Sequence, residues 1–187
     1  MTKASATFKA GRARARGGAL LAASLLAAWC GPLRAAAPPA VPVTAAVFPF
    51  ELDDTSLDGA MRGVQPAEQA RLLALDARLR SALAASGRYT LLDTAPVAAR
   101  AAAASLRSCE SCGPALARQL GAQVEVNGWV QKVSNLILNI NVVVRDAASG
   151  RVIDAGSADI RGNTDESWQH GLSWLLRHRI LADGRTP

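Results

Sequence analysis

Hydrophobic and polar positions follow different periods along the chain, and these periods predict its elements. Between residues 66 and 86, leucines recur every three or four positions: Leu72, Leu75, Leu79 and Leu83. This spacing is typical of an amphipathic helix that buries one face. Pro66 suits the first turn and Gly87 the C-terminal cap, so we expect a helix from Pro66 to Ser86.

A second pattern has a period of two and predicts a three-stranded antiparallel meander. From Val124 to Gln131 the apolar side chains alternate with polar ones, and the alternation resumes from Leu136 to Val144. Such alternation indicates strands with one buried face. The segment from Ala147 to Gly150 has the length and the final glycine of a hairpin loop. The third strand is then expected from Arg151 to Arg161.

Shorter patterns predict the elements that precede the meander. Val43 to Phe50 is almost continuously apolar, which is typical of a buried strand, and an acidic loop from Glu51 to Gly59 follows it. A second strand is expected from Arg88 to Asp93. Two helices come next, one from Pro96 to about Leu106 and one from Gly113 to Gly121.

The last predicted helix begins after Asn163, a suitable N-cap, with Glu166 three residues later as in a capping box. Its buried stripe consists of Trp168, Leu172, Leu175, Leu176 and Ile180. Together these elements predict an α+β fold. We expect a two-layer sandwich with a mixed sheet, which includes the C-terminal three-stranded antiparallel meander, and helices packed on one face.

The first 37 residues have the three-part pattern of a secretory signal peptide. Basic residues without any acid precede an apolar run of 11 residues from Ala19 to Trp29, and a small-residue stretch follows. The run is shorter than the ~20 residues that span a bilayer, so we expect cleavage between residues 33 and 40 and a periplasmic location. Cys30 offers lipidation as an alternative, although Trp29 is not the small residue that usually precedes a lipidated cysteine. Residues 38–187 then form one domain.

Removing this leader changes the electrostatic balance of the chain. The leader holds six of the 21 basic residues and none of the 15 acidic ones, so the remainder has 15 of each sign. The net charge of +6 therefore comes from the targeting segment. It gives no support for nucleic-acid binding.

The polar face of the predicted meander is the best candidate binding surface. Three asparagines lie on one strand, although strands disfavour this residue type. Helices should cover the apolar face, which leaves Trp129 as an aromatic anchor among polar groups. Plain solvation of an open sheet explains the pattern equally well. The candidate binding residues, including the turn after the last strand, are Asn127, Trp129, Asn135, Asn139, Asn141, Asp159, Arg161 and Asn163. The same face carries Glu125, Gln131, Arg145 and Ser157.

Cys109 and Cys112 are the only cysteines after the leader. In an oxidising compartment such a pair favours a structural disulfide. Thiol exchange is an alternative, because a helix N-terminus lowers the pKa of a thiol. A metal site would need two further donors that the sequence does not indicate.

Other candidate sites have weaker support. Four residues have the spacing of a calcium loop: Asp54, Ser56, Asp58 and Gly59. Gln65 occupies the position that requires a bidentate glutamate, so an ordinary acidic surface loop is favoured. His170 and His178 would lie about 12 Å apart on one helix, too far to share a metal. We find no catalytic motif and expect neither a metal nor a cofactor.

The segment LGAQVEVNGWVQKVSNLILNINVVVRDAASGRVIDAGS resembles the N-terminal domain of TolB-type periplasmic proteins and the related curli-secretion lipoproteins. The matching positions are Gly121, Ala122, Gly128, Asp146 and Gly150. A closer resemblance, carried by FPFELDDTS, SGRY, KVSNLILN and DIRGNTDESW, is to a family of predicted bacterial secreted proteins with a domain of unknown function. The first resemblance implies a TolB-N-like domain. The second implies an association with periplasmic quinoprotein dehydrogenases, and neither supplies a catalytic residue.

The sequence therefore favours a non-enzymatic periplasmic accessory or binding protein. Its partner protein or ligand would bind the polar sheet face, and a quinoprotein dehydrogenase system is one candidate source of that partner. A thiol-disulfide redox protein that uses Cys109 and Cys112 is an alternative. A further alternative is an outer-membrane lipoprotein of envelope assembly, which would contact the membrane only through lipidated Cys30.

Overall fold

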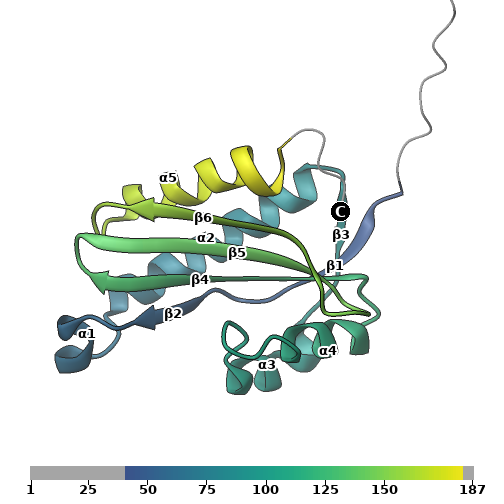
Figure 1. The fold of residues 1–187 in the computed structure, drawn as a ribbon, viewed down its shortest axis with the longest axis horizontal. Helices are drawn as coiled ribbons and strands as arrows, with labels where there is room; N and C mark the ends of the chain where they lie inside the picture. The colour runs from purple at the N-terminus through teal and green to yellow at the C-terminus, as the bar shows by residue number, and fades with distance from the viewer. Residues whose placement is uncertain (1–40, 183–187) are drawn as a thin grey trace, which may run out of the picture. The chain divides into compact units, whose positions relative to one another are not determined.

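A computed structural model of the chain describes residues 41–182 (Figure 1). These residues form one open, mixed sheet of six strands with five α-helices, an α+β fold. The predicted signal peptide, its cleavage site and Cys30 lie outside the described residues. No helix among residues 41–182 is both long enough and apolar enough to cross a membrane.

The strands and helices follow one another along the chain as the figure labels them. The strands are β1 (Val43–Val47), β2 (Glu51–Asp54), β3 (Tyr89–Leu91), β4 (Val124–Ser134), β5 (Ile137–Asp146) and β6 (Val152–Ile160). The helices are α1 (Leu57–Arg62), α2 (Pro66–Ala85), α3 (Ala98–Ala104), α4 (Cys112–Gln119) and α5 (Asp165–Leu175). A 3₁₀ turn (Ala95–Val97) precedes α3, and a π-helical turn (Leu176–Ile180) continues α5.

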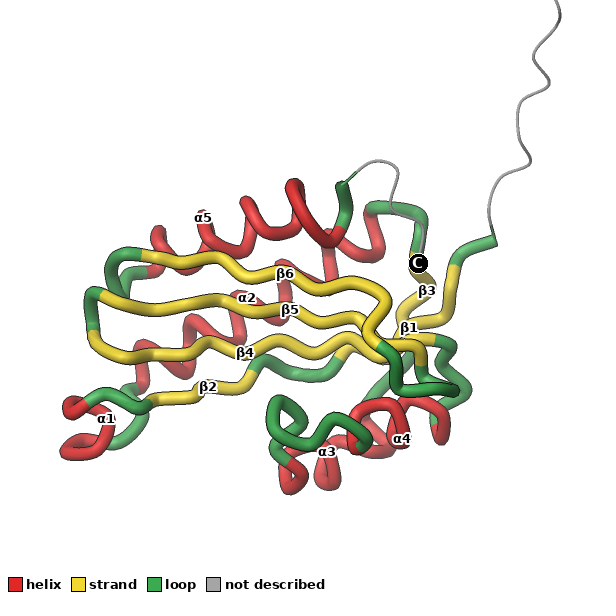
Figure 2. Tube along the Cα trace, viewed as in Figure 1, coloured by secondary structure: helices red, strands yellow, loops and turns green. Residues whose placement is uncertain are grey.

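The sheet has the strand order β3-β1-β4-β5-β6, and β2 pairs with β4 beyond the end of β1 (Figure 2). β1 and β2 both run parallel to β4, whereas β4, β5 and β6 are antiparallel neighbours. The predicted meander is therefore confirmed. β1 and β2 act as two pieces of one strand along β4, interrupted at Pro49.

The main core lies between the meander and helices α2 and α5. The four predicted leucines of α2 are buried, and so is the predicted apolar stripe of α5 and the turn that follows it. They pack on the even-numbered side chains of β4 and β5, among them Val126, Val130, Ile140 and Val142. The side chains that the helical and strand periods predicted to be buried are thus those found in the main core.

A second, smaller core lies on the opposite side of β1. Ala46 and Phe48 point to this side and pack among residues of α3 and α4, whereas Ala45 and Val47 join the main core. This explains why β1 is apolar at successive positions, since a strand buried on both faces needs no polar side. At β1, helices therefore cover both faces of the sheet.

Three local expectations differ from the structure. The three asparagines do not share one strand, because Asn135 lies in the turn between β4 and β5, whereas Asn139 and Asn141 are on β5. The segment from Glu51 to Gly59 is not a plain acidic loop, because it contains β2 and the start of α1. The N-cap of α5 is Thr164 and not Asn163: the Thr164 hydroxyl accepts a hydrogen bond from the Ser167 N–H at 3.2 Å. Asn163 uses its side chain for contacts with α2 and the β4–β5 turn instead.

Candidate functional site

Lys132 is a fully buried cation at the end of β4. It occupies a core-facing position of a strand whose other core-facing residues are apolar, and none of its side chain is exposed. Its ammonium lies 2.6 Å from Glu68 Oε1, 3.0 Å from Asp54 Oδ2 and 3.6 Å from Asp58 Oδ2. A buried charge is tolerated only when it is paired and hydrogen-bonded. The three carboxylates supply that compensation.

Burial and pairing act in opposite directions on these charges. Burial alone would lower the pKa of Lys132, but hydrogen bonds and ion pairs with Glu68 and Asp54 outweigh it and raise the pKa above its usual value. Burial alone would raise the pKa of Glu68, and hydrogen bonds from Lys132 and neighbouring amides bring it below its usual value. The pKa of Asp54 is also lowered against burial, through hydrogen bonds from Ser56 and Lys132. All three groups are therefore charged at neutral pH.

Glu68 links the buried cation to the first turn of α2. Its Oε2 accepts a hydrogen bond from the Gln65 N–H at 3.0 Å, which completes a capping box at the start of α2. Its Oε1 accepts from Lys132 and, at 2.7 Å, from the side-chain amide of Asn163. The same carboxylate therefore caps a helix and neutralises a strand residue.

Asp54 ties the network to α1. Its Oδ1 accepts hydrogen bonds from the N–H and the hydroxyl of Ser56, and the Ser56 hydroxyl in turn accepts from the Gly59 N–H at 3.0 Å. Gly59 is required by this packing, because a Cβ there would lie 2.3 Å from the Asp54 carboxyl group. The conformation of α1 and the position of Asp54 are thus coupled.

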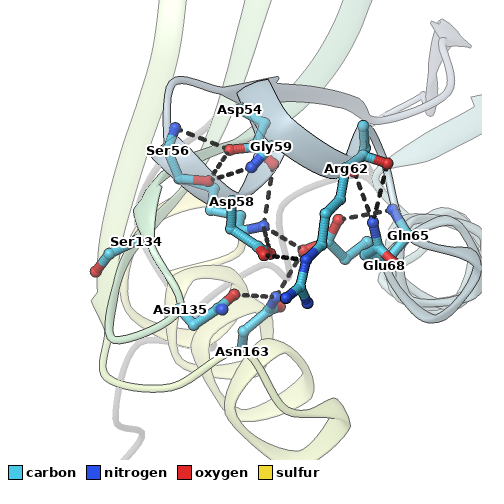
Figure 3. Close-up of polar contacts among 12 residues, drawn as sticks. Asp54, Ser56, Asp58, Gly59, Arg62, Gln65, Glu68, Ser134, Asn135 and Asn163 are labelled. Carbon is cyan, nitrogen blue, oxygen red and sulfur yellow. Dashed lines mark hydrogen bonds and ion pairs between the residues drawn. The ribbon is translucent and has the colours of Figure 1, made fainter.

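Asn163, in the turn between β6 and α5, joins three segments. Its amide nitrogen donates to Glu68 and, at 3.1 Å, to the Asn135 side-chain oxygen in the β4–β5 turn. Its own side-chain oxygen accepts from Arg71 at 3.1 Å, and Arg71 also pairs with Asp165 at 2.6 Å. Figure 3 shows the side chains converging from α1, α2 and the two turns. We call this end of the sheet the α1 end: α1, the β4–β5 turn and the β6–α5 turn.

The α1 end contains a surface cavity of about 440 Å³ above the buried network. Its lining includes Asp58, Glu68, Arg71, Asn135 and Asn163. Exposed apolar side chains occur on α1, at the end of β4, in the β4–β5 turn and at the start of β5: Leu57, Met61, Val133, Leu136 and Ile137. Leu136 lines the cavity. The α1 end therefore combines a charged, buried network with exposed apolar side chains.

The charged groups of this network are not poised for proton transfer at neutral pH. A general acid or base near pH 7 needs a pKa close to that value. The pairing instead lowers the carboxyl pKa values and raises that of Lys132, so none of the three is poised to exchange protons at neutral pH. The described side chains also include no group of three His, Cys, Asp or Glu residues placed to hold a metal ion. The carboxylates of the suspected calcium loop, Asp54 and Asp58, face the ammonium of Lys132.

The structure divides the predicted binding residues into three groups. Asn135 and Asn163 belong to the α1 end. Asn139 lies on the open sheet face, where it donates to Asp159 at 2.6 Å and accepts from Ser157 at 2.8 Å. Trp129 and Asn141 are half-buried on paired positions of β4 and β5, and Arg161 is exposed.

Asn127 differs from the others because it is buried, and so are Glu125 and Arg145 of the same predicted polar face. Glu125 pairs with Arg145 at 3.4 Å, and α4 approaches so closely that a Cβ on Gly113 would lie 2.4 Å from Glu125 Oε1. Burial raises the pKa of Glu125 to about 7, although Arg145 lowers it. The first part of β4 is therefore covered on both faces, which alternation alone does not reveal.

Sequence reasoning missed the two residues on which the network depends, Lys132 and Glu68. A signal was present: Lys132 falls on an even position of an otherwise apolar face, and Glu68 stands three residues after Gln65 at a helix start.

The other predicted features are placed as follows. Cys109 forms a disulfide with Cys112, which is the first residue of α4 and lies three residues further along the chain. Trp174 is partly exposed on α5, with its ring 5.2 Å from that of His178. Neither feature contacts the α1 end.

Residues 43–180 match the DUF3280 family, described as "Protein of unknown function (DUF2380)". The chain belongs to this family. Membership confirms the predicted resemblance to a family of unknown function. The match covers nearly all of the residues that the structure of this DUF3280 member describes. The TolB resemblance and the link to quinoprotein dehydrogenases stay predictions.

No curated protein matches this family member in sequence. Similar solved structures include the LpoB C-terminal domain from Salmonella enterica, with 20% identity, a TM-score of 0.46, and coverage of 65% of this chain and 84% of that one. The LpoB C-terminal domain from Escherichia coli has 16% identity, a TM-score of 0.46, and coverage of 66% and 87%. The lipoprotein GNA1162 from Neisseria meningitidis has 17% identity, a TM-score of 0.44, and coverage of 66% and 84%. At these values the likeness carries no functional conclusion.

Proposed function

We propose that this chain is a non-enzymatic accessory protein of the periplasm that binds a partner protein through its α1 end. The observation that carries the proposal is the exposure of apolar side chains on α1 and in the β4–β5 turn, two segments that the charged network at Lys132 and Asn163 holds together. Leu57 and Met61, one turn apart on α1, are each 76% exposed, and Leu136 across the cavity is 71% exposed. Clustered apolar exposure of this kind marks protein interaction sites.

The exposed apolar side chains of α1 have no structural use within the domain. α1 contains no buried residue, so its apolar side chains do not contribute to either core. What holds α1 in place is polar: the N-cap at Ser56, and the contacts of Asp54 and Asp58 with Lys132. A helix held by its polar side presents Leu57 and Met61 outward.

Preorganisation favours binding at this end. The network fixes α1, α2 and both turns relative to one another before a partner arrives, which reduces the ordering cost of association. Met61 adds an adaptable contact, since methionine fits irregular apolar surfaces. The open sheet face with Asn139, Asn141 and Trp129 lies beside this end and would extend the contact with polar groups.

A partner in the periplasm follows from the predicted signal peptide over residues 1–37, with residues 38–187 as the mature domain. A periplasmic quinoprotein dehydrogenase is the candidate partner that the sequence resemblance suggests. The mature chain would need no cofactor to act as a docking protein.

Photo-crosslinking tests this proposal. A photoreactive residue is placed at Met61, at Leu136 or, as a control, at Leu73, which is 63% exposed on α2. After irradiation of whole cells, we expect Met61 and Leu136 to crosslink the same protein and Leu73 to give no such product. Equal crosslinking from all three positions, or different proteins at Met61 and Leu136, would overturn the proposal.

A further inference from the structure

The outer edge of β2 carries unpaired backbone groups. The Thr55 N–H donates to the Lys132 carbonyl at 2.9 Å, at the end of a parallel ladder in which Asp53 pairs with Gln131. In a parallel ladder only alternate residues of a strand direct their N–H and C=O groups toward the partner strand. Asp53 and Thr55 therefore face β4, and Leu52 directs its backbone N–H and C=O away from β4.

Side chains of α2 form hydrogen bonds with backbone groups at this edge that precede Leu52 in the chain. The Val47 carbonyl accepts a hydrogen bond from Arg80, and the Phe50 N–H donates to Asp76 Oδ1 at 2.7 Å. Leu52 is the next residue whose backbone points outward. Within residues 41–182, no hydrogen bond reaches the outward N–H or C=O of Leu52.

A groove of about 420 Å³ runs along this part of the edge. Leu52 and Phe50 form one side of it, and Ala98, Ala101 and Ala102 of α3 form the opposite side. Gln69 and Leu72 of α2 also line the groove. The alanines keep the opposite wall short, so the groove has room for a further main chain.

Contacts within the chain hold the two sides of the groove in place without a bound peptide. Glu51 Oε1 accepts a hydrogen bond from the Leu106 N–H at 2.6 Å, and Arg107 pairs with Asp53 at 3.1 Å. These contacts tie the segment after α3 to β2, and thereby fix the distance between the two walls.

We infer that this groove binds an extended peptide segment of a partner protein, which adds to the outer edge of β2 as a further strand. The N–H and C=O of Leu52 point in the same direction, and the group that satisfies both at once is another extended backbone. A side chain of the peptide that points toward Ala98, Ala101 and Ala102 meets methyl groups, so small apolar residues fit there. The inference concerns a different surface from the α1 end and does not depend on the function proposed for that end.

A pool of capped hexapeptides with every residue type at each position tests the inference on the full chain. Peptides that bind are expected to slow hydrogen exchange of the Leu52 amide, by about tenfold when free peptide is about nine times Kd. Ala102 and Ala103 provide a matched pair, because both are exposed on α3 but only Ala102 lines the groove. Ala102→Trp should abolish binding, and Ala103→Trp should leave Kd within about twofold of the wild type.

Three results would overturn the inference. One is a pool in which no peptide binds. Another is equal affinity in the Ala102→Trp and Ala103→Trp variants, which would place the peptide elsewhere. The third is binding without protection of the Leu52 amide, which would exclude strand addition. Ala102→Leu, a smaller change at the same exposed position, replaces Ala102→Trp if thermal unfolding shows the larger variant to be misfolded.

Discussion

The ammonium of Lys132 lies 2.6 Å from Oε1 of Glu68, and neither side chain reaches solvent. The two residues belong to different layers, one to the sheet and one to α2. Their pairing holds the N-terminus of α2 against the end of β4.

Removing Lys132 should therefore be costly. Lys132→Met leaves the Glu68 and Asp54 carboxylates close together without their cation, and we expect a loss of about 3–5 kcal/mol in the free energy of unfolding. Denaturant unfolding at pH 7 measures it. The double variant Lys132→Met/Glu68→Gln should be more stable than Lys132→Met alone, because one uncompensated charge is gone. Strictly additive losses would contradict the pairing.

The buried carboxyl group of Glu125 lies at the other end of β4, and we expect it to make the free energy of unfolding depend on pH. Its pKa is raised from 4.5 to about 7 by burial, so the folded state keeps a proton that the unfolded state releases above pH 4.5. This contribution to stability is present at low pH and is lost as the pH rises to about 7, at about 1.4 kcal/mol per pH unit.

Glu125→Gln isolates this contribution, because the amide resembles the protonated acid. We expect the stability of the variant relative to the wild type to increase between pH 5 and pH 7, and then to stay constant up to pH 8. The free energy of unfolding of both proteins is measured across this range. Parallel pH profiles would show that Glu125 titrates normally in the folded state.

Gly59 tests the coupling between α1 and Asp54. Helix propensity alone predicts that Gly59→Ala stabilises α1 by about 1 kcal/mol. A Cβ 2.3 Å from the Asp54 carboxyl carbon must instead displace that group from Lys132, so we expect a net loss of about 1–3 kcal/mol. Ala60→Gly, at an exposed position of the same helix, should cost no more than about 1 kcal/mol. A stabilised Gly59→Ala variant would mean that Asp54 is free to move.

Much of the fold was predictable because local periods and tertiary burial agree. The leucines of α2 and the alternation of β4 and β5 each satisfy one buried face, and the structure buries those same faces. Asn139 and Asn141 are on the less buried face for the same reason. Burial of Asn127 and Glu125 was not predictable, since it depends on α4 and β1, which cover the start of β4 from distant parts of the chain.

The centre of the candidate site could not be derived from spacing. Lys132 meets Asp54 across 78 residues and Glu68 across 64, so no local pattern brings them together. Asn163 was predicted as the cap of the last helix, because an asparagine before an acidic helix start is suited to capping. Thr164 takes the cap, and Asn163 is left to join α2 and the β4–β5 turn.

Removing the disulfide distinguishes a structural role of the two cysteines from a redox role. Replacing both Cys109 and Cys112 by serine removes a short loop closure, and we expect a loss of about 2 kcal/mol in the free energy of unfolding. Binding of the partner at the α1 end should not change, because the bridge lies beside α4 and outside that site. Loss of partner capture in a folded double-serine variant would instead support thiol-disulfide exchange.

The central claim is that exposed apolar residues of the α1 end dock a partner. The most direct test compares the affinity of the crosslinked partner, once purified, for the wild type, for Leu57→Glu/Met61→Glu and for Leu73→Glu. All three positions are more than 60% exposed, so neither variant should lose stability. We expect the α1 variant to bind at least about tenfold more weakly, a loss of about 1.4 kcal/mol, and Leu73→Glu to bind like the wild type. Equal affinity of all three proteins would contradict the central claim.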